Sequence, residues 1–264
     1  MGPHSDERVS KFYAETYDEA VPDWPGEMDF WRSYAADLRE KGERLLDVAC
    51  GTGRIGIPLA QEGIAVTGLD LSEKMLEVAK QKSAGIPGIR WVHSDMCAFD
   101  LAEEFGLAII GGHAFLNLNT VQEQLGCLQS IRRHLEPGGR LIIHIDYPDV
   151  AWLGDLMGEN AGAFEPEQEF VHPRTGRRIR QSQGWRYEPA TQTAISEMLW
   201  EELGEDGRVL DSLQTEPQRF HCIFRFEMEH LLVRAGYEIE ALYGDFFRHP
   251  LADKSPGMIW VARA

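Results

Sequence analysis

Short apolar runs and amphipathic stretches alternate along most of the chain. The apolar runs predict strands at Arg44–Ala49, Ile64–Leu69, Ile89–His93, Leu107–Ile110 and Arg140–Ile145. Between them, apolar residues recur at the spacing of one helix face. Strands that alternate with helices in this way predict a parallel sheet with helices on both faces.

Local signals mark the ends of several predicted helices. Ser72 is a typical N-cap for a helix that runs to about Lys82. Thr120 and Glu123 form a capping-box pattern ahead of a later helix, and the Pro-Gly-Gly turn at residues 137–139 is expected to end that helix.

The beginning of the chain is predicted to be helical over residues 5–40 and is rich in aromatic side chains. Pro22 and Pro25 interrupt this pattern, and Gly42 is expected to end the second helix before the first strand. We expect residues 1–42 to form an N-terminal helical lid.

The rhythm of the pattern changes between residues 165 and 225. Short alternating segments predict antiparallel strands at residues 177–186, 193–201, 209–215 and 218–224. Asp206-Gly207 is a hairpin signal between two of them. The α/β pattern then resumes with a helix at residues 226–235 and strands at residues 237–243 and 258–262. The expected organisation is a core of residues 43–160 and 226–264 with an inserted sheet at residues 165–225.

The net charge and the composition of the chain argue against several kinds of binding partner. The chain has 264 residues and a formal net charge of −17, which disfavours nucleic acid and anionic membrane surfaces. Its four cysteines lie far apart without metal-site spacing, so neither a metal nor a disulfide framework is expected. No apolar run has the length of a membrane span and the N-terminus lacks a signal-peptide pattern, so we expect a cytoplasmic protein.

A glycine-rich turn follows the first predicted strand, in the stretch LLDVACGTG at residues 45–53. Gly51, Gly53 and Gly56, with Asp70 nineteen residues after Gly51, fit the fingerprint of a dinucleotide site. Asp47 stands before the glycines, where a carboxylate repels a pyrophosphate but suits an ammonium group. The charge argument therefore favours a different nucleoside ligand, with an NAD(P)-dependent reductase as the alternative.

The chain resembles a class I S-adenosylmethionine-dependent methyltransferase over nearly its whole length. The matching motifs, in order, are LLDVACGTGR, LDLSEKML, HSDM and LEPGGRLIIH. The family often has Gly where this chain has Ala49. The resemblance implies an α/β fold, with a Rossmann-like sheet of seven strands whose last strand is antiparallel. To this the pattern adds an inserted antiparallel β-sheet that forms a lid.

The resemblance also implies a cofactor site for S-adenosylmethionine. Asp47 and the backbone of Ala49, Gly51 and Gly53 would surround the methionine amino group, and Arg54 would reach its carboxylate. Asp70 would accept both ribose hydroxyls. The groups around the adenine would be Leu71, Met75, Asp95 and Met96.

The motifs say less about which residues contact the methyl acceptor. His113 would border the transfer centre and has the titration range of a general base, and Tyr13 and Tyr17 resemble a segment that closes over the cofactor. Further candidates for contact with the acceptor are Asn117, Asp146, Tyr147, Arg180, Trp185, Tyr187, His221, Arg225, Asp245 and Phe246. Each of these residues also has a purely structural interpretation.

The inserted segment carries a basic run with no acid between its arginines: Arg174, Arg177, Arg178, Arg180 and Arg186. Such a run indicates either an anionic acceptor or an exposed edge strand protected by charge. The predicted activity is methyl transfer to a small molecule or short peptide by a monomer or homodimer. The other alternative is a cofactor-binding protein without transfer activity.

Overall fold

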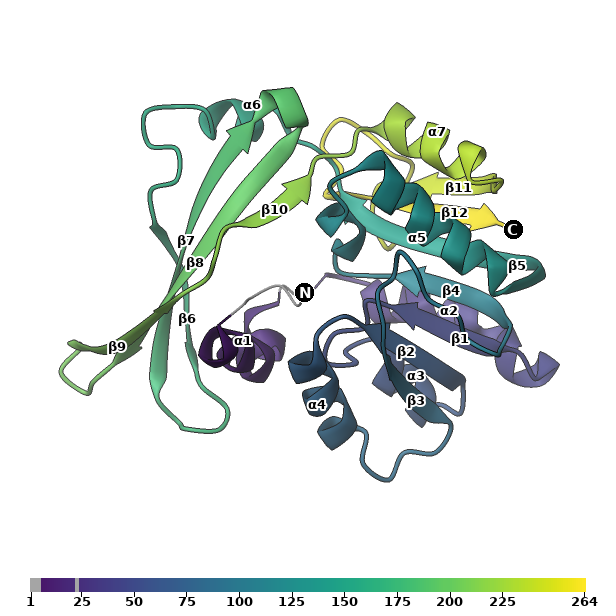
Figure 1. Cartoon of the computed structure of the whole chain (residues 1–264), viewed down its shortest axis with the longest axis horizontal. Helices are drawn as coiled ribbons and strands as arrows, with labels where there is room; N and C mark the ends of the chain where they lie inside the picture. The colour runs from purple at the N-terminus through teal and green to yellow at the C-terminus, as the bar shows by residue number, and fades with distance from the viewer. Residues whose placement is uncertain (1–5, 22–23) are drawn as a thin grey trace. The chain divides into compact units, whose positions relative to one another are not determined.

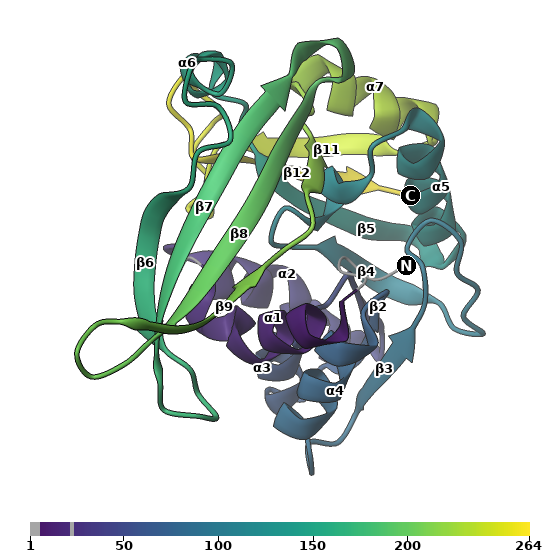
Figure 2. The ribbon, with the colours of Figure 1, turned by 60° about the vertical axis from the view of Figure 1, so that its left-hand side comes forward.

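The computed structural model describes residues 6–21 and 24–264. Its contacts divide the chain into two compact units. We call described residues 24–147 and 223–264 the core unit, and residues 6–21 and 148–222 the insert unit. Figures 1 and 2 show the ribbon of both units from two directions.

A seven-stranded sheet forms the centre of the core unit, with the order β11-β12-β5-β4-β1-β2-β3. Its strands are β1 Arg44–Val48, β2 Ala65–Asp70, β3 Ile89–His93, β4 Phe105–Ile110, β5 Leu135–Asp146, β11 Glu238–Tyr243 and β12 Gly257–Arg263. The last strand, β12, runs antiparallel to both β5 and β11, and the other neighbouring pairs are parallel. The predicted α/β fold class is confirmed.

Helices cover both faces of this sheet (Figure 1). They are α2 Glu27–Lys41, α3 Gly56–Gln61, α4 Glu73–Lys82, α5 Val121–Arg133 and α7 Arg225–Arg234, with a short 3₁₀ turn, η1, at Ala114–Asn117. Apolar residues of α2 and α3, such as Trp31 and Leu59, form one buried cluster with Leu45 and Ile109 of the sheet. This packing holds the carboxyl ends of β1 and β4 in fixed positions.

The predicted helix caps of the core are confirmed. The Ser72 hydroxyl accepts the Met75 N–H at the start of α4. Thr120 and Glu123 form a reciprocal capping box at the start of α5.

The predicted role of the Pro-Gly-Gly turn at residues 137–139 is wrong. Helix α5 ends at Arg133, and β5 begins at Leu135 and runs through the turn. The pairing of β4 with β5 shifts register between Phe105 and Leu107, so the turn lies in a bulge. Gly138 has a φ of 82°, which a glycine adopts without a steric penalty.

The insert unit is built on an antiparallel sheet with the order β10-β8-β7-β6, and β9 also pairs with β8. The strands are β6 Glu165–Val171, β7 Arg178–Glu188, β8 Thr193–Leu203, β9 Val209–Gln214 and β10 Gln218–His221. The helical elements are α1 Glu7–Ala20, α6 Val150–Asp155 and the 3₁₀ turn η2 Pro189–Thr191. Neither β6 nor α6 is predicted by the sequence pattern, because β6 is dominated by exposed glutamates and α6 is very short.

Helix α1 packs on the insert sheet, where the Phe12 and Trp200 ring centroids lie 5.0 Å apart. Helix α2, in contrast, contacts β1 and β4 of the core sheet. The two helices of the predicted lid, residues 1–42, therefore belong to different units, and their action as a lid stays a prediction. Residues 1–5 of that lid and its predicted break at Pro22 lie outside the described residues. No helix within residues 6–21 and 24–264 is long and apolar enough to cross a membrane.

Candidate active site

The glycine-rich turn leaves β1 in an unusual backbone conformation. Ala49, Gly51 and Gly53 all have positive φ, at 55°, 55° and 78°. A Cβ atom on Gly53 would lie 2.7 Å from the ring of Trp91, so no larger residue fits there without movement. The backbone therefore forms a tight turn at the carboxyl edge of the parallel strands, where open α/β sheets bind ligands.

Asp70 ties this turn to the next helix. One carboxylate oxygen accepts the Gly51 N–H at 2.8 Å, and the other accepts the Ser72 N–H at 2.8 Å. Burial raises the pKa of Asp70, and these two backbone donors work against the rise. Each oxygen keeps lone pairs that can accept a further hydrogen bond from a ligand.

Asp47 lies beneath the same turn and is almost completely buried. Its Oδ2 atom has no hydrogen-bond partner among the described residues, and a Cβ atom on Gly56 would come within 2.9 Å of it. Burial raises the pKa of Asp47 to about 7, although the nearby Arg54 opposes the rise. A buried carboxylate oxygen without a hydrogen-bond partner is costly, so the geometry suits a positively charged group on a ligand.

Arg54 is held by the protein itself. Its guanidinium forms an ion pair with the buried Glu27 and lies over the Trp24 ring, 5.0 Å from the centroid. The predicted contact with a ligand carboxylate stays a prediction, and it would have to be made alongside this ion pair.

The residues predicted around the adenine lie after β2 and β3, at the same edge of the sheet. Leu71 and Asp95 are exposed, Met96 is half-buried and Met75 is buried in α4. The Asp95 carboxylate accepts the Cys97 N–H at 2.8 Å.

A group of aromatic rings gathers around His113 after β4. Its Nδ1 atom lies 3.0 Å from Asp146 Oδ1 at the end of β5, within ion-pair distance but not aligned for a hydrogen bond. The imidazole of His144 lies 4.3 Å from that of His113, and Trp24 lies 5.2 Å from it, measured between ring centroids. His113 itself has a φ of 62°, and strained backbone of this kind clusters at functional sites.

His144 belongs to this group, although the sequence pattern does not single it out. It lies within β5 and is buried, and burial keeps the pKa of its imidazole well below the usual range. The signal is a single histidine in the apolar run LIIHID, which on its own cannot be told from a histidine packed in the core.

The other predicted acceptor residues of the core unit do not form one group. Phe246 is buried against Phe30 and Trp31. The exposed Asn117 side chain donates to the Ala114 carbonyl, and the exposed Arg225 lies over Phe226. Tyr147 is half-buried just after β5.

Strand alternation separates the predicted acceptor residues of the insert sheet. Trp185 pairs with Ser196 and Tyr187 with Ala194, on one face of the sheet. Arg180 pairs with Glu201, and His221 pairs with Thr193, on the opposite face. These four residues therefore cannot act together in a single site.

The basic run of the insert is neutralised by glutamates of neighbouring strands. The ion pairs join Arg177 to Glu202, Arg178 to Glu169, Arg180 to Glu201 and Arg186 to Glu197. The sequence of the basic run does not predict these ion pairs, because the glutamates belong to other strands, β6 and β8. The arginines thus form a ladder of cross-strand ion pairs.

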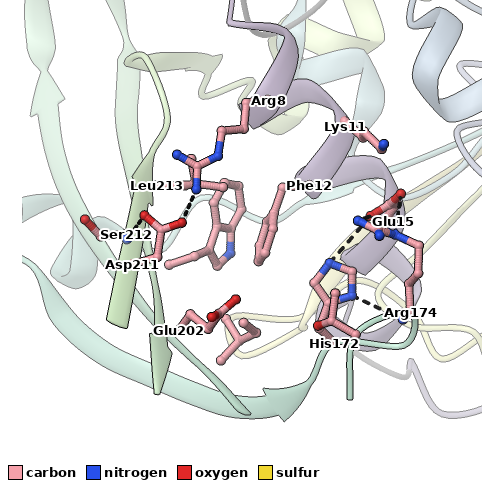
Figure 3. A pocket seen from close by; sticks show the side chains of 13 residues that line it. Arg8, Lys11, Phe12, Glu15, His172, Arg174, Glu202, Asp211, Ser212 and Leu213 are labelled. Carbon is pink, nitrogen blue, oxygen red and sulfur yellow. Dashed lines mark hydrogen bonds and ion pairs between the residues drawn. The ribbon is translucent and has the colours of Figure 1, made fainter. Parts of the chain in front are cut away.

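A cavity of about 270 Å³ lies within the insert unit, between α1 and the sheet. Figure 3 shows the side chains that line it. Glu15 pairs there with Arg174 and lies 3.5 Å from His172, and Arg8 pairs with Asp211. Tyr13 and Tyr17 of α1 do not line this cavity; their rings lie 5.6 Å apart, and Tyr13 lies 6.1 Å from Trp200.

The sheet order, the antiparallel last strand and the acid-flanked glycine turn together define the class I S-adenosylmethionine-dependent methyltransferase fold. Residues 45–139 of the chain match the family model described as "Methyltransferase domain". The resemblance stated from the sequence is confirmed.

Known relatives agree with this class. The Bacillus subtilis protein YqeM, named a putative methyltransferase, is 38% identical over 137 residues, which cover 50% of this chain and 53% of YqeM. The chain thus spans about half the length of the curated relatives it matches.

Two solved structures share the fold over almost the whole chain. The methyltransferase CcbJ from Streptomyces caelestis has a TM-score of 0.78 and 24% identity, with 96% of each chain covered. CalS10 from Micromonospora echinaspora, an amino pentose methyltransferase, has a TM-score of 0.65 and 23% identity, with 95% of each chain covered. The match to CcbJ is long enough to include most of the inserted sheet.

Proposed function

We propose that this protein binds S-adenosylmethionine in the core unit and transfers its methyl group to a small-molecule acceptor. The observation that carries the proposal is the pair of acids at the glycine turn. Asp47 is a buried carboxylate without a partner for Oδ2 among the described residues, and Asp70 ends the neighbouring strand. A nucleoside that carries an amino acid offers both acids a partner: an ammonium group for Asp47 and ribose hydroxyls for Asp70.

The residues present fit this cofactor. Asp47 would face the ammonium group of the methionine part, whose positive charge compensates the buried carboxylate. Asp70 would accept the two ribose hydroxyls in charge-assisted hydrogen bonds, and Asp95 would accept the adenine amino group. Leu71 and Met75 would supply apolar contact to the adenine, and the Met96 backbone N–H would face a ring nitrogen. A pyrophosphate would instead be repelled by Asp47, which argues against the reductase alternative.

When bound, S-adenosylmethionine supplies an electrophilic methyl group on its sulfonium. The chain's task is then to hold the acceptor in line with that methyl group and to exclude water. His113 would accept the acceptor's proton on the ring nitrogen turned away from Asp146, and Asp146 would orient the imidazole and stabilise its charged form. The distance of 3.0 Å between His113 Nδ1 and Asp146 Oδ1 allows this.

We propose a small molecule as the acceptor. CalS10, which shares the fold, is described as an amino pentose methyltransferase, and the ion-paired arginines of the insert are poorly placed to bind a nucleic acid. On the insert sheet, Trp185 and Tyr187 share one face and would contact the acceptor, whereas Arg180 and His221 lie on the other face. Tyr13 and Tyr17 of α1 would close over the bound cofactor.

The experiment that tests this function detects turnover through the product of the methyl donor. The protein is incubated with S-adenosylmethionine and a panel of amino sugars and other small amines and alcohols, and S-adenosylhomocysteine is quantified. We expect acceptor-dependent product with the wild type and much less with His113→Ala. Tight binding of S-adenosylmethionine without turnover for any acceptor class would instead favour the non-catalytic alternative.

A further inference from the structure

A small aromatic cleft of about 170 Å³ opens beside His144 in the core unit. Its walls include Trp24, His144, Phe246, Phe247, Pro256 and Ile259. Most of this lining is apolar, and Phe247 is 61% exposed although it is a large hydrophobic residue. A cleft of this kind in a strongly acidic protein is a candidate ligand site.

His144 supplies the only imidazole among the described residues that line the cleft. It is 2% exposed, and its Nδ1 atom has no hydrogen-bond partner in the described part of the chain. The imidazole is neutral because burial lowers its pKa. A buried polar atom without a partner is rare in folded proteins, and the second ring nitrogen of His144, Nε2, lies next to Gly257 of the cleft lining.

Glycine keeps the space beside this imidazole open. A Cβ atom at Gly257 would lie 3.1 Å from His144 Nε2, and Gly257 also lines the cleft. Any larger residue at position 257 would therefore press on the ring and occupy part of the cleft.

The loop that carries Phe247 is held in one conformation. The Asp245 carboxylate accepts the N–H groups of Phe247 and His249 and pairs with the His249 ring. Arg248 has a φ of 65°, and its guanidinium lies 5.0 Å from the Tyr34 ring centroid. A non-glycine residue persists in this conformation only when its surroundings enforce it, so Phe247 is presented at the cleft and is not free to move away.

The lining defines the chemistry of the occupant. No lysine or arginine lines the cleft among the described residues, and the acid present, Asp245, is already engaged by the loop. An apolar cavity of roughly 150 Å³ is large enough to bind benzene. We propose that this cleft binds an uncharged six-membered ring that carries one hydrogen-bonding group, with His144 as its polar partner.

This inference names the acceptor class for the proposed function and, to that extent, rests on it. The ring centroids of His144 and His113 lie 4.3 Å apart, so a ring bound here would lie beside the proposed base. Binding of the ring itself does not depend on methyl transfer, which allows the two claims to be tested separately.

The test uses fluorine NMR titrations of 4-fluorophenol, fluorobenzene and 4-fluorobenzoate into the full chain. We expect 4-fluorophenol to bind more tightly than fluorobenzene, and 4-fluorobenzoate not to bind. Phe247→Ala removes one exposed wall and should raise the Kd of both neutral probes by at least about threefold. Phe226→Ala is the matched control, because Phe226 is 66% exposed in the same unit but lies outside the cleft.

A second variant tests the polar partner. His144→Phe keeps a ring in contact with Trp24 and Phe246 but removes the nitrogen atoms, so the preference for 4-fluorophenol over fluorobenzene should disappear. Absence of probe binding, or equal Kd values for Phe247→Ala and Phe226→Ala, would overturn the inference. Calorimetry with S-adenosylmethionine on the same samples keeps the claims distinct: donor binding without probe binding contradicts only the cleft, and probe binding without donor binding contradicts only the proposed function.

Discussion

The two acids at the glycine turn, Asp47 and Asp70, differ in how their carboxylates are hydrogen-bonded, and this difference supports the proposed function. Asp70 is satisfied by two backbone N–H groups, so its charge is supported before any ligand binds. Asp47 has no such support for its Oδ2 atom among the described residues and is almost completely buried. A cationic ligand group would therefore change the protonation of Asp47 far more than that of Asp70.

Asp47→Asn tests this contrast through the number of protons that the protein releases when S-adenosylmethionine binds. With a pKa of about 7, Asp47 is mostly protonated at pH 6 without ligand, and an ammonium group beside it would drive the proton off. Calorimetry of S-adenosylmethionine binding in buffers of different ionisation enthalpy should show release of about one proton at pH 6 in the wild type. The asparagine variant should release much less, and equal release by both proteins would rule out this role for Asp47.

The same raised pKa has a stability consequence. The unfolded chain loses the Asp47 proton near pH 4, whereas the folded chain keeps it until about pH 7. The unfolded state then binds fewer protons in this window, so Asp47 lowers the free energy of unfolding as pH rises from 4 to 7. Urea denaturation of the wild type and Asp47→Asn across this range should show a difference that grows with pH. A difference that stays constant would show that Asp47 ionises normally in the folded chain.

Asp70→Ala should weaken S-adenosylmethionine binding by about 2–4 kcal/mol, because two ribose hydroxyls would lose a charged acceptor. The substitution also removes two backbone contacts, so circular dichroism must first establish that the variant is folded. Asp253→Ala is the control, since Asp253 is an exposed acid of the same unit away from the glycine turn. A dissociation constant unchanged from the wild type would refute the ribose assignment.

His113→Ala should lower kcat by roughly 10²–10⁴-fold, the usual contribution of a general base, while donor affinity stays within about twofold. Steady-state kinetics with the acceptor found in the turnover screen, together with calorimetry of the donor, measures both quantities. Equal losses of donor affinity and kcat would place His113 in the cofactor site.

Asp146→Asn is the companion variant, because it keeps the base and removes the charge beside it. Loss of the carboxylate that lies 3.0 Å from His113 Nδ1 should lower kcat by a smaller factor than His113→Ala does, with donor affinity unchanged. Steady-state kinetics and calorimetry of the donor measure both quantities. A kcat equal to that of the wild type would show that Asp146 does not assist His113.

Candidate site residues can be predicted from the sequence only where they lie within a motif. Asp47, Asp70 and Asp95 stand at strand ends with glycines or helix caps beside them, so the sequence indicates their edge of the sheet. His144 has no such context, because it lies inside an apolar strand. The partner of Arg54 is equally hidden, since Glu27 comes from a helix far away in the chain.

At the scale of elements, the glycine turn is the segment whose backbone decides the site. Gly53→Ala should destabilise it, because the added Cβ atom would lie 2.7 Å from Trp91 and 2.9 Å from Ile57, at a φ of 78°. Urea denaturation should show a loss of about 2 kcal/mol or more, accompanied by weaker donor binding.

Ala49→Gly is the matched control for the same turn. Ala49 has a φ of 55°, a conformation that costs about 1–2 kcal/mol for a residue with a Cβ atom, so glycine should fit there without loss of stability. If Gly53→Ala proves as stable as Ala49→Gly, the backbone of this turn is less constrained than the geometry indicates.

The element predictions succeed where local chemistry decides the boundaries. Ser72 and the Thr120–Glu123 capping box begin helices as expected, because a cap needs only its near neighbours. The role of the Pro-Gly-Gly turn was predicted wrongly, since its place in a β-bulge depends on pairing with β4. For the same reason the arginines of β7 could not be assigned from their own strand.

At the scale of the whole molecule, the alternating pattern was sufficient to predict the class of fold. It identified the parallel strands and the inserted antiparallel sheet, and the resemblance supplied the antiparallel last strand. The division into units was not predictable, because α1 and α2 are neighbours in the chain but pack on different sheets. Tertiary packing, which a linear pattern does not contain, decides that division.

Isothermal titration of the wild-type chain with S-adenosylmethionine and, separately, with NADH and NADPH distinguishes the two ligands that the glycine turn could bind. We predict saturable binding of S-adenosylmethionine with one site per chain, and no measurable heat from either dinucleotide. Tight binding of NADH or NADPH, with no response to S-adenosylmethionine, would mean that the turn is a dinucleotide site.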